Sequence, residues 1–126
     1  MKRLSGLAAL LLTSAALACP VKQGYVANGL FKNTAGAKPI CGPLYQTFRF
    51  SMAGVKWTEM YEVKAGRVGQ LRTSDFLALI RRGRYRLVKQ NKTVRSQVYL
   101  FERGSHSITV VVGVSGGAQY IGLAGQ

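Results

Sequence analysis

Residues 94–123, with the sequence VRSQVYLFERGSHSITVVVGVSGGAQYIGL, alternate apolar with polar side chains and contain two glycine-bearing turns. Such alternation is typical of half-buried β-strands, because successive side chains of a strand point to opposite faces. The turn residues stand at 104–106 and 115–117. We therefore predict three strands joined by short turns, over residues 94–103, 108–114 and 120–123.

A further strand is predicted immediately before this stretch. Tyr85 and Leu87 alternate with Arg84 and Arg86, and a polar turn is expected at 90–92. Consecutive strands joined by short turns pair with their sequence neighbours in antiparallel fashion. The C-terminal part of the chain therefore predicts a four-stranded antiparallel meander.

Residues 73–83 predict a short α-helix. Thr73 or Ser74 can accept a hydrogen bond from a free backbone N–H of the first turn. Apolar side chains recur at helical spacing at Phe76, Leu79 and Ile80. Gly83 is expected to end the helix in the left-handed conformation, which glycine adopts without strain. A helix this short is not stable alone in water, so its apolar side must pack on a sheet.

Two earlier strands are predicted over residues 45–52 and 55–63. In the first, Phe48 and Phe50 alternate with polar neighbours. In the second, the apolar residues share one parity. Trp57, the sole tryptophan, is expected to be an anchor buried beneath the helix, and the alternative is an aromatic cluster that faces a ligand.

These elements predict an α+β fold in which one short helix packs on an antiparallel sheet of about five to six strands. The expected organisation is a signal peptide over residues 1–18, an extended arm over 19–43 and a single α+β domain over 44–126. The arm is expected to be irregular because glycine and proline interrupt each of its apolar runs.

The first residues are typical of an export signal. Lys2 and Arg3 precede an apolar run over 4–17, and small residues at Ala16 and Ala18 suit signal peptidase. This run is shorter than the ~20 apolar residues of a transmembrane helix, and no later segment is long enough. We therefore expect an exported protein that is periplasmic, secreted or attached to the envelope, without a transmembrane segment.

The chain has two cysteines, Cys19 and Cys41. An oxidising compartment favours a disulfide between them, which would hold the arm in a loop. The alternative is that Cys19 is the lipid-bearing first residue of a lipoprotein. Both interpretations remain open at this point, with the disulfide preferred because lipidation would leave Cys41 as an odd thiol.

The chain is strongly basic, with 18 Lys and Arg against 4 Asp and Glu and a net charge of +14. Such a charge attracts polyanions through a long-range force that salt weakens. The densest basic block is expected to form the binding surface, with Arg81, Arg82, Arg84, Arg86, Lys89, Lys92 and Arg95. The alternative is that the charge only keeps the protein soluble or matches it to an anionic envelope.

Aromatic residues adjoin this block. Tyr99, Phe101 and Arg103 share one face of the predicted strand over 94–103. Arginine-flanked aromatics on a sheet can stack on the bases of single-stranded nucleic acid, so all three are included in the predicted polyanion site. The same pattern is expected if Tyr99 and Phe101 instead face the helix and form the core.

No catalytic or metal site is predicted. The single histidine, His106, lies in an expected turn, and the four acids form no pair at catalytic or ligand spacing. We therefore predict a non-enzymatic binding domain without a cofactor, whose partner is nucleic acid or an anionic envelope surface. The alternatives are a structural or protein-interaction domain of an envelope assembly, with an envelope protein as its partner, and a small hydrolase built around His106.

Overall fold

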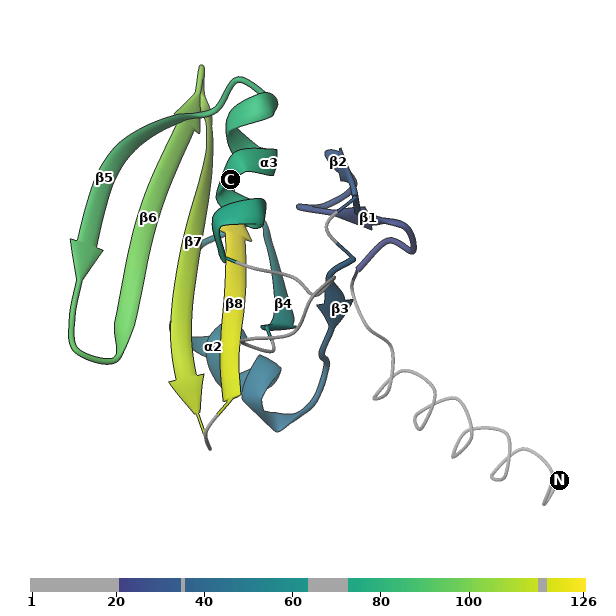
Figure 1. The fold of residues 1–126 in the computed structure, drawn as a ribbon, viewed down its shortest axis with the longest axis vertical. Helices are drawn as coiled ribbons and strands as arrows, with labels where there is room; N and C mark the ends of the chain where they lie inside the picture. Colours follow the sequence, from purple (N-terminus) through teal and green to yellow (C-terminus); the bar gives the residue numbers. More distant parts are fainter. Residues whose placement is uncertain (1–20, 35, 64–72, 116–117) are drawn as a thin grey trace, which may run out of the picture.

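A computed structural model describes residues 21–34, 36–63, 73–115 and 118–126 (Figure 1). The predicted signal peptide and Cys19 lie outside these residues, so export and the pairing of Cys19 with Cys41 stay predictions. The described part is α+β, with a six-stranded antiparallel sheet in the order β3-β4-β8-β7-β6-β5 and a separate hairpin of β1 and β2. Helices α2 and α3 pack on opposite faces of the six-stranded sheet.

The helices are α2 (Pro43–Ser51) and α3 (Thr73–Arg82). The strands are β1 (Tyr25–Val26), β2 (Phe31–Lys32), β3 (Lys38–Pro39), β4 (Trp57–Val63), β5 (Arg86–Lys92), β6 (Ser96–Arg103), β7 (His106–Ser115) and β8 (Ala118–Gly125). The predicted helix over 73–83 and the four-stranded meander are therefore confirmed. The segment expected to be an irregular arm supplies three short strands, and one of them, β3, forms an edge of the main sheet.

The first hairpin of the meander is longer than predicted. Strand β5 continues through Lys92, and the turn lies at residues 93–95 rather than at 90–92. In that turn the Thr93 hydroxyl accepts a hydrogen bond from the backbone N–H of Ser96 at 3.1 Å. Because β5 is an edge strand whose last residues are exposed, polar side chains there did not indicate a turn.

The prediction of a strand over 45–52 is wrong, because residues Pro43–Ser51 form helix α2. Gly42 precedes the helix and Pro43 occupies its first turn, where a missing N–H costs nothing. Tyr45 and Phe48 lie at helical spacing and pack on the face of the sheet opposite α3. Phe50 is 78% exposed, so its alternation with Phe48 did not reflect a buried face. The described residues therefore form two helices, rather than the single helix that was expected.

The helical assignment predicts that Phe50 is dispensable. Phe50→Ser is expected to change the free energy of unfolding by less than about 0.5 kcal/mol, because the ring buries little surface in the fold. Urea unfolding of the variant measures this change. A loss above about 1 kcal/mol would mean that Phe50 is packed, as the strand interpretation required.

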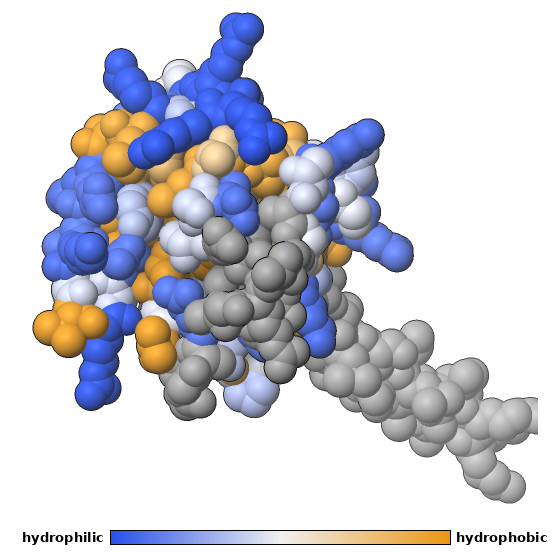
Figure 2. All heavy atoms as spheres, in the orientation of Figure 1, coloured by the Kyte–Doolittle hydropathy of each residue, from blue (hydrophilic) through white to orange (hydrophobic). Residues whose placement is uncertain are grey.

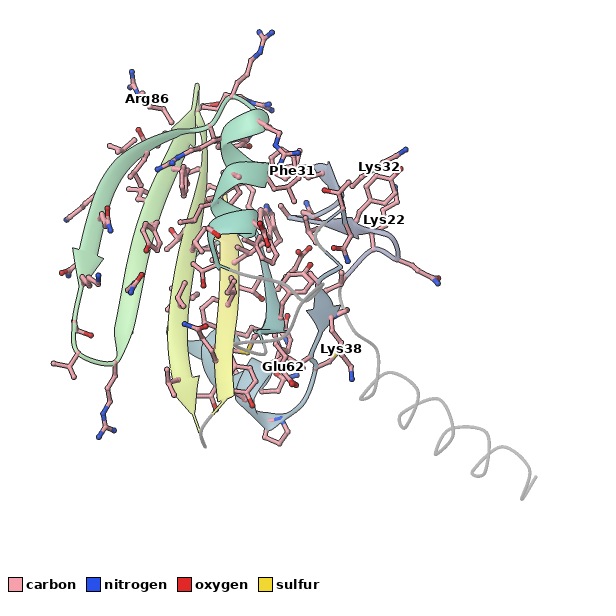
Figure 3. The ribbon with its side chains drawn as sticks, viewed as in Figure 1. Lys22, Phe31, Lys32, Lys38, Glu62 and Arg86 are labelled. Carbon is pink, nitrogen blue, oxygen red and sulfur yellow. The ribbon has the colours of Figure 1, made fainter. Side chains whose placement is uncertain are left out.

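The glycine after α3 does not have the predicted role. Gly83 lacks a positive φ, and the left-handed residue is Arg84, with φ of 68°. A Cβ atom at Gly83 would overlap the ring of Phe31, which reaches the end of α3 from β2 (Figure 3). Close packing of the arm against the helix end therefore requires glycine here, and the prediction of a left-handed Gly83 is wrong.

A buried carboxylate ties the arm to the sheet. Glu59 of β4 is 1% exposed, and its Oε1 and Oε2 accept hydrogen bonds from the backbone N–H groups of Ala27 and Asn28, both at 2.7 Å. The Tyr61 hydroxyl also donates to Glu59 Oε1, at 2.6 Å. Burial and the neighbouring carboxylate raise the pKa of Tyr61 above its ordinary range, so its hydroxyl remains a donor. The turn between β1 and β2 is thus seated on Glu59.

Candidate polyanion-binding site

Exposed arginines gather at one end of the sheet, where α3 ends, β5 begins and β6 turns into β7 (Figure 2, top of the view). We call this cluster the basic end, and its members are Arg81, Arg82, Arg84, Arg86 and Arg103. Figure 3 shows Arg86 there, directed away from the body of the molecule. The structure therefore brings together five of the ten residues predicted for the polyanion site.

Local structure explains this gathering. Arg81 and Arg82 form the last turn of α3, where cations interact favourably with the helix dipole. Arg84 makes the left-handed turn that reverses the chain, and Arg86 is the first residue of β5. A helix end and a strand start lie four residues apart at this point, so the arginines cannot separate widely.

Arg103 joins the cluster from β6 and is held in place by two contacts. Its Nη1 donates a hydrogen bond to the backbone carbonyl of Gly83 at 2.8 Å. Its guanidinium carbon also lies 4.7 Å from the centroid of the Tyr85 ring, a cation–π distance. The guanidinium is therefore preorganised while remaining exposed, which lowers the entropy lost when it binds an anion.

The remaining cations of the predicted cluster lie elsewhere. Lys89 and Lys92 follow β5 away from the basic end, and Arg95 lies in the turn at the far end of the hairpin. At about 3.3 Å per residue, Arg86 and Lys92 are roughly 20 Å apart. Lysines on an exposed edge strand also discourage pairing with other chains, which is a sufficient reason for their presence.

Two aromatic residues of the predicted site belong to the core instead. Tyr99 is 7% exposed and Phe101 is 0% exposed, and both lie in the cluster that α3 covers. The two rings therefore face helix α3 and form part of the core, rather than an exposed stacking surface. Neither ring is available for base stacking, because the face that carries them is the inner face of the sheet.

Acidic side chains are distributed unevenly. Glu102 lies opposite Arg86 in the register of β5 and β6 and is exposed. Glu59 is buried under the arm, while Glu62 and Asp75 lie toward the opposite end of the sheet. The described part of the chain therefore presents five arginines at the basic end against one exposed acidic side chain there.

A cleft of about 310 Å³ adjoins the basic end. Its walls come from the arm, the start of β4, the segment after α3, the turn between β6 and β7, and the residue after β8. The lining residues are Asn28, Leu30, Lys56, Trp57, Tyr85, Arg103, His106, Ser107 and Gln126. The cleft could not be predicted from the sequence, because it combines five segments that are distant in the chain.

Among the described residues, His106 is the one histidine that could serve in a catalytic or metal site. His106 is exposed at the start of β7, and its Nδ1 lies 3.4 Å from the backbone oxygen of Gln126. No group of three or more potential metal ligands gathers in the part of the chain that the structure describes. No helix in that part is long and apolar enough to cross a membrane.

Comparison with known proteins found no matching family model, no matching curated protein and no matching solved structure.

Proposed function

We propose that this protein is an exported, non-enzymatic domain that binds a polyanion, either nucleic acid or an anionic envelope component, through its basic end. The observation that carries the proposal is the grouping of five exposed arginines around the end of α3 with a single exposed acidic side chain among them. Arginine pairs with phosphate or carboxylate through two parallel hydrogen bonds, which suits repeated anionic groups. The mechanism is charge neutralisation with release of counterions.

The backbone at Arg84 supports this proposal. A left-handed conformation costs an ordinary residue roughly 1–2 kcal/mol that glycine avoids. Arg84 nevertheless occupies this conformation, with φ of 68°, directly after a glycine. Such strain is often retained where a side chain serves a function.

Binding titrations with the full chain test the proposal. Labelled single-stranded DNA, duplex DNA and anionic vesicles are compared at two salt concentrations, since the interaction is strongest where screening is weakest. Replacing Arg81, Arg82, Arg84 and Arg86 together by glutamine is expected to weaken binding at least about tenfold and to flatten the salt dependence. The matched control replaces Lys89, Lys92 and Arg95 by glutamine, which removes charge from β5 and its turn but leaves the basic end intact.

Comparison of the affinities of the two variants shows whether the position of the cations or only their number matters. Selective loss of affinity in the arginine variant supports binding at the basic end. Equal losses in both variants would reduce the effect to net charge. Absence of binding by the unaltered chain at low salt would overturn the proposed function.

Arg84→Gly is expected to separate stability from binding. Removing the left-handed strain should raise the free energy of unfolding by about 0.5–1 kcal/mol, while loss of the cation weakens polyanion binding. Denaturant unfolding and the titration above measure the two effects. Arg82→Gly is the control, because glycine at this last helical position of α3 should lower stability, by less than the roughly 1 kcal/mol that glycine costs in a helix interior. A destabilised Arg84→Gly protein would contradict the argument from strain.

The alternative function is a protein-interaction domain of an envelope assembly. One observation favours it: β5 is an edge strand of the sheet, and Val88 on it and Val94 in the following turn are exposed. An added strand from a partner could pair with such an edge. Under this alternative, loss of the arginines at the basic end leaves partner binding unchanged.

A further inference from the structure

We propose that the cleft beside the basic end binds one nucleotide unit of single-stranded nucleic acid, with the base against Trp57 and the phosphate at Arg103. This inference rests on the proposed function and specifies its ligand. It concerns a different set of side chains from the four arginines tested above, except that Arg103 belongs to both the basic end and the cleft.

The base has an aromatic floor. Trp57 of β4 lies opposite Gly125 of β8 in the sheet, and a Cβ atom at Gly125 would overlap the indole ring. The indole therefore lies across the bare backbone of Gly125 and remains partly exposed, as a lining residue of the cleft. The exposed part of an aromatic ring can stack on any base, because every base has a π-face.

The phosphate has a fixed cation. Arg103 uses Nη1 to bind the Gly83 carbonyl and rests on the Tyr85 ring, which leaves further N–H donors of its guanidinium free to meet an oxyanion. Because both contacts already hold the guanidinium before binding, the side chain loses little conformational entropy when the ligand binds. Arg103 thus links the cleft to the flanking phosphates that the basic end would bind.

The rest of the cleft fits the same ligand. Lys56 and His106 add donors for anionic oxygen, while Asn28, Ser107 and Gln126 offer groups that hydrogen-bond base edges or sugar hydroxyls. None of its nine lining side chains is acidic. Its volume of about 310 Å³ lies at the lower end for small-ligand sites, so it suits one unit of a chain rather than several.

The sole tryptophan provides the assay. Tryptophan fluorescence of the full chain is followed while adenosine 5′-monophosphate is added. Saturable quenching is expected, and ribose 5-phosphate and adenosine, which lack the base and the phosphate respectively, should each bind at least about tenfold more weakly. Glucuronate tests whether the cleft instead prefers an acidic sugar.

Two variants locate the contacts. Arg103→Gln is expected to weaken binding of adenosine monophosphate about tenfold, while the control replacement of Lys89, Lys92 and Arg95, which lie away from the cleft, should leave it nearly unchanged. Trp57→Leu should weaken the binding of a labelled single-stranded oligonucleotide about tenfold, as measured by fluorescence anisotropy. Arg103→Gln keeps Trp57, so the test stands even if Trp57→Leu does not fold.

The outcomes distinguish this inference from the proposed function. Salt-sensitive oligonucleotide binding that leaves tryptophan fluorescence and the Trp57→Leu variant unaffected would overturn the cleft and retain the basic end. Tighter binding of glucuronate than of adenosine monophosphate would also overturn it. If the chain binds no oligonucleotide or other polyanion at low salt, the proposed function itself fails.

Discussion

Glu59→Leu is expected to lower the free energy of unfolding by about 4 kcal/mol and to release the arm from the sheet. The substitution removes the acceptor of two backbone N–H groups and of the Tyr61 hydroxyl. Hydrogen bonds to a charged group contribute about 1.5–3 kcal/mol each, and a buried donor left unpaired costs about 1–3 kcal/mol. The turn at Ala27 and Asn28 can relax in part and expose its N–H groups to water, so the expected loss is about 4 kcal/mol rather than the full cost of three bonds.

Urea unfolding measures the loss, and hydrogen exchange of the Ala27 and Asn28 amides reports release of the arm. Glu59→Gln should fall between the leucine variant and the unaltered chain, because an amide keeps one acceptor but turns a donor toward one N–H. The control is Glu62→Leu on the same strand, which is half-buried and beside β3, and it should cost less than about 1 kcal/mol. Retained stability and amide protection in Glu59→Leu would show that apolar packing alone holds the arm.

Gly125→Ala is expected to lower the free energy of unfolding by about 2–3 kcal/mol. A methyl group there overlaps the indole of Trp57, and β8 cannot yield because it is paired on both sides by β4 and β7. Overpacking of this kind typically costs 1–3 kcal/mol. The indole must move, so tryptophan emission should shift to the red and the proposed nucleotide cleft should lose its floor.

Gly113→Ala in β7 is the matched control, because a Cβ atom there meets nothing within 4 Å. Alanine has the lower conformational entropy in the unfolded chain, so this variant should be neutral or more stable by up to about 1 kcal/mol. Denaturant unfolding of the two proteins compares the same chemical change at two places in one sheet. Equal effects at both positions would mean that Trp57 does not rest on Gly125.

Regular elements with a repeating pattern could be predicted from the sequence. The helix at Thr73–Arg82 has a polar start, an apolar stripe and basic residues in its last turn, and the meander has alternation with glycine-bearing turns. Both patterns arise from local geometry, in which side chains repeat every 3.6 residues in a helix and every 2 in a strand. Helix α2 was missed because Phe48 and Phe50 stand at strand spacing, whereas the buried pair Tyr45 and Phe48 stands at helical spacing.

The candidate site was predictable only in part. Arg81, Arg82, Arg84 and Arg86 are neighbours in the chain, so their proximity follows from a helix end next to a strand start. The approach of Arg103 depends on pairing of β5 with β6 and on its bond to Gly83. The cleft needs β4, β8 and the arm in addition, and no local pattern records which strands become neighbours.

The basic composition, the helix at 73–82 and the meander follow from the order of residues alone, because charge and hydrophobic period are local properties of the chain. Only the tertiary structure decided that Tyr99 and Phe101 are buried, that Glu59 seats the arm and that Gly83 and Gly125 admit aromatic rings. These outcomes depend on which segment covers which face of the sheet. A strand carries two faces with similar alternation, and the contact that distinguishes them comes from residues far away in the chain.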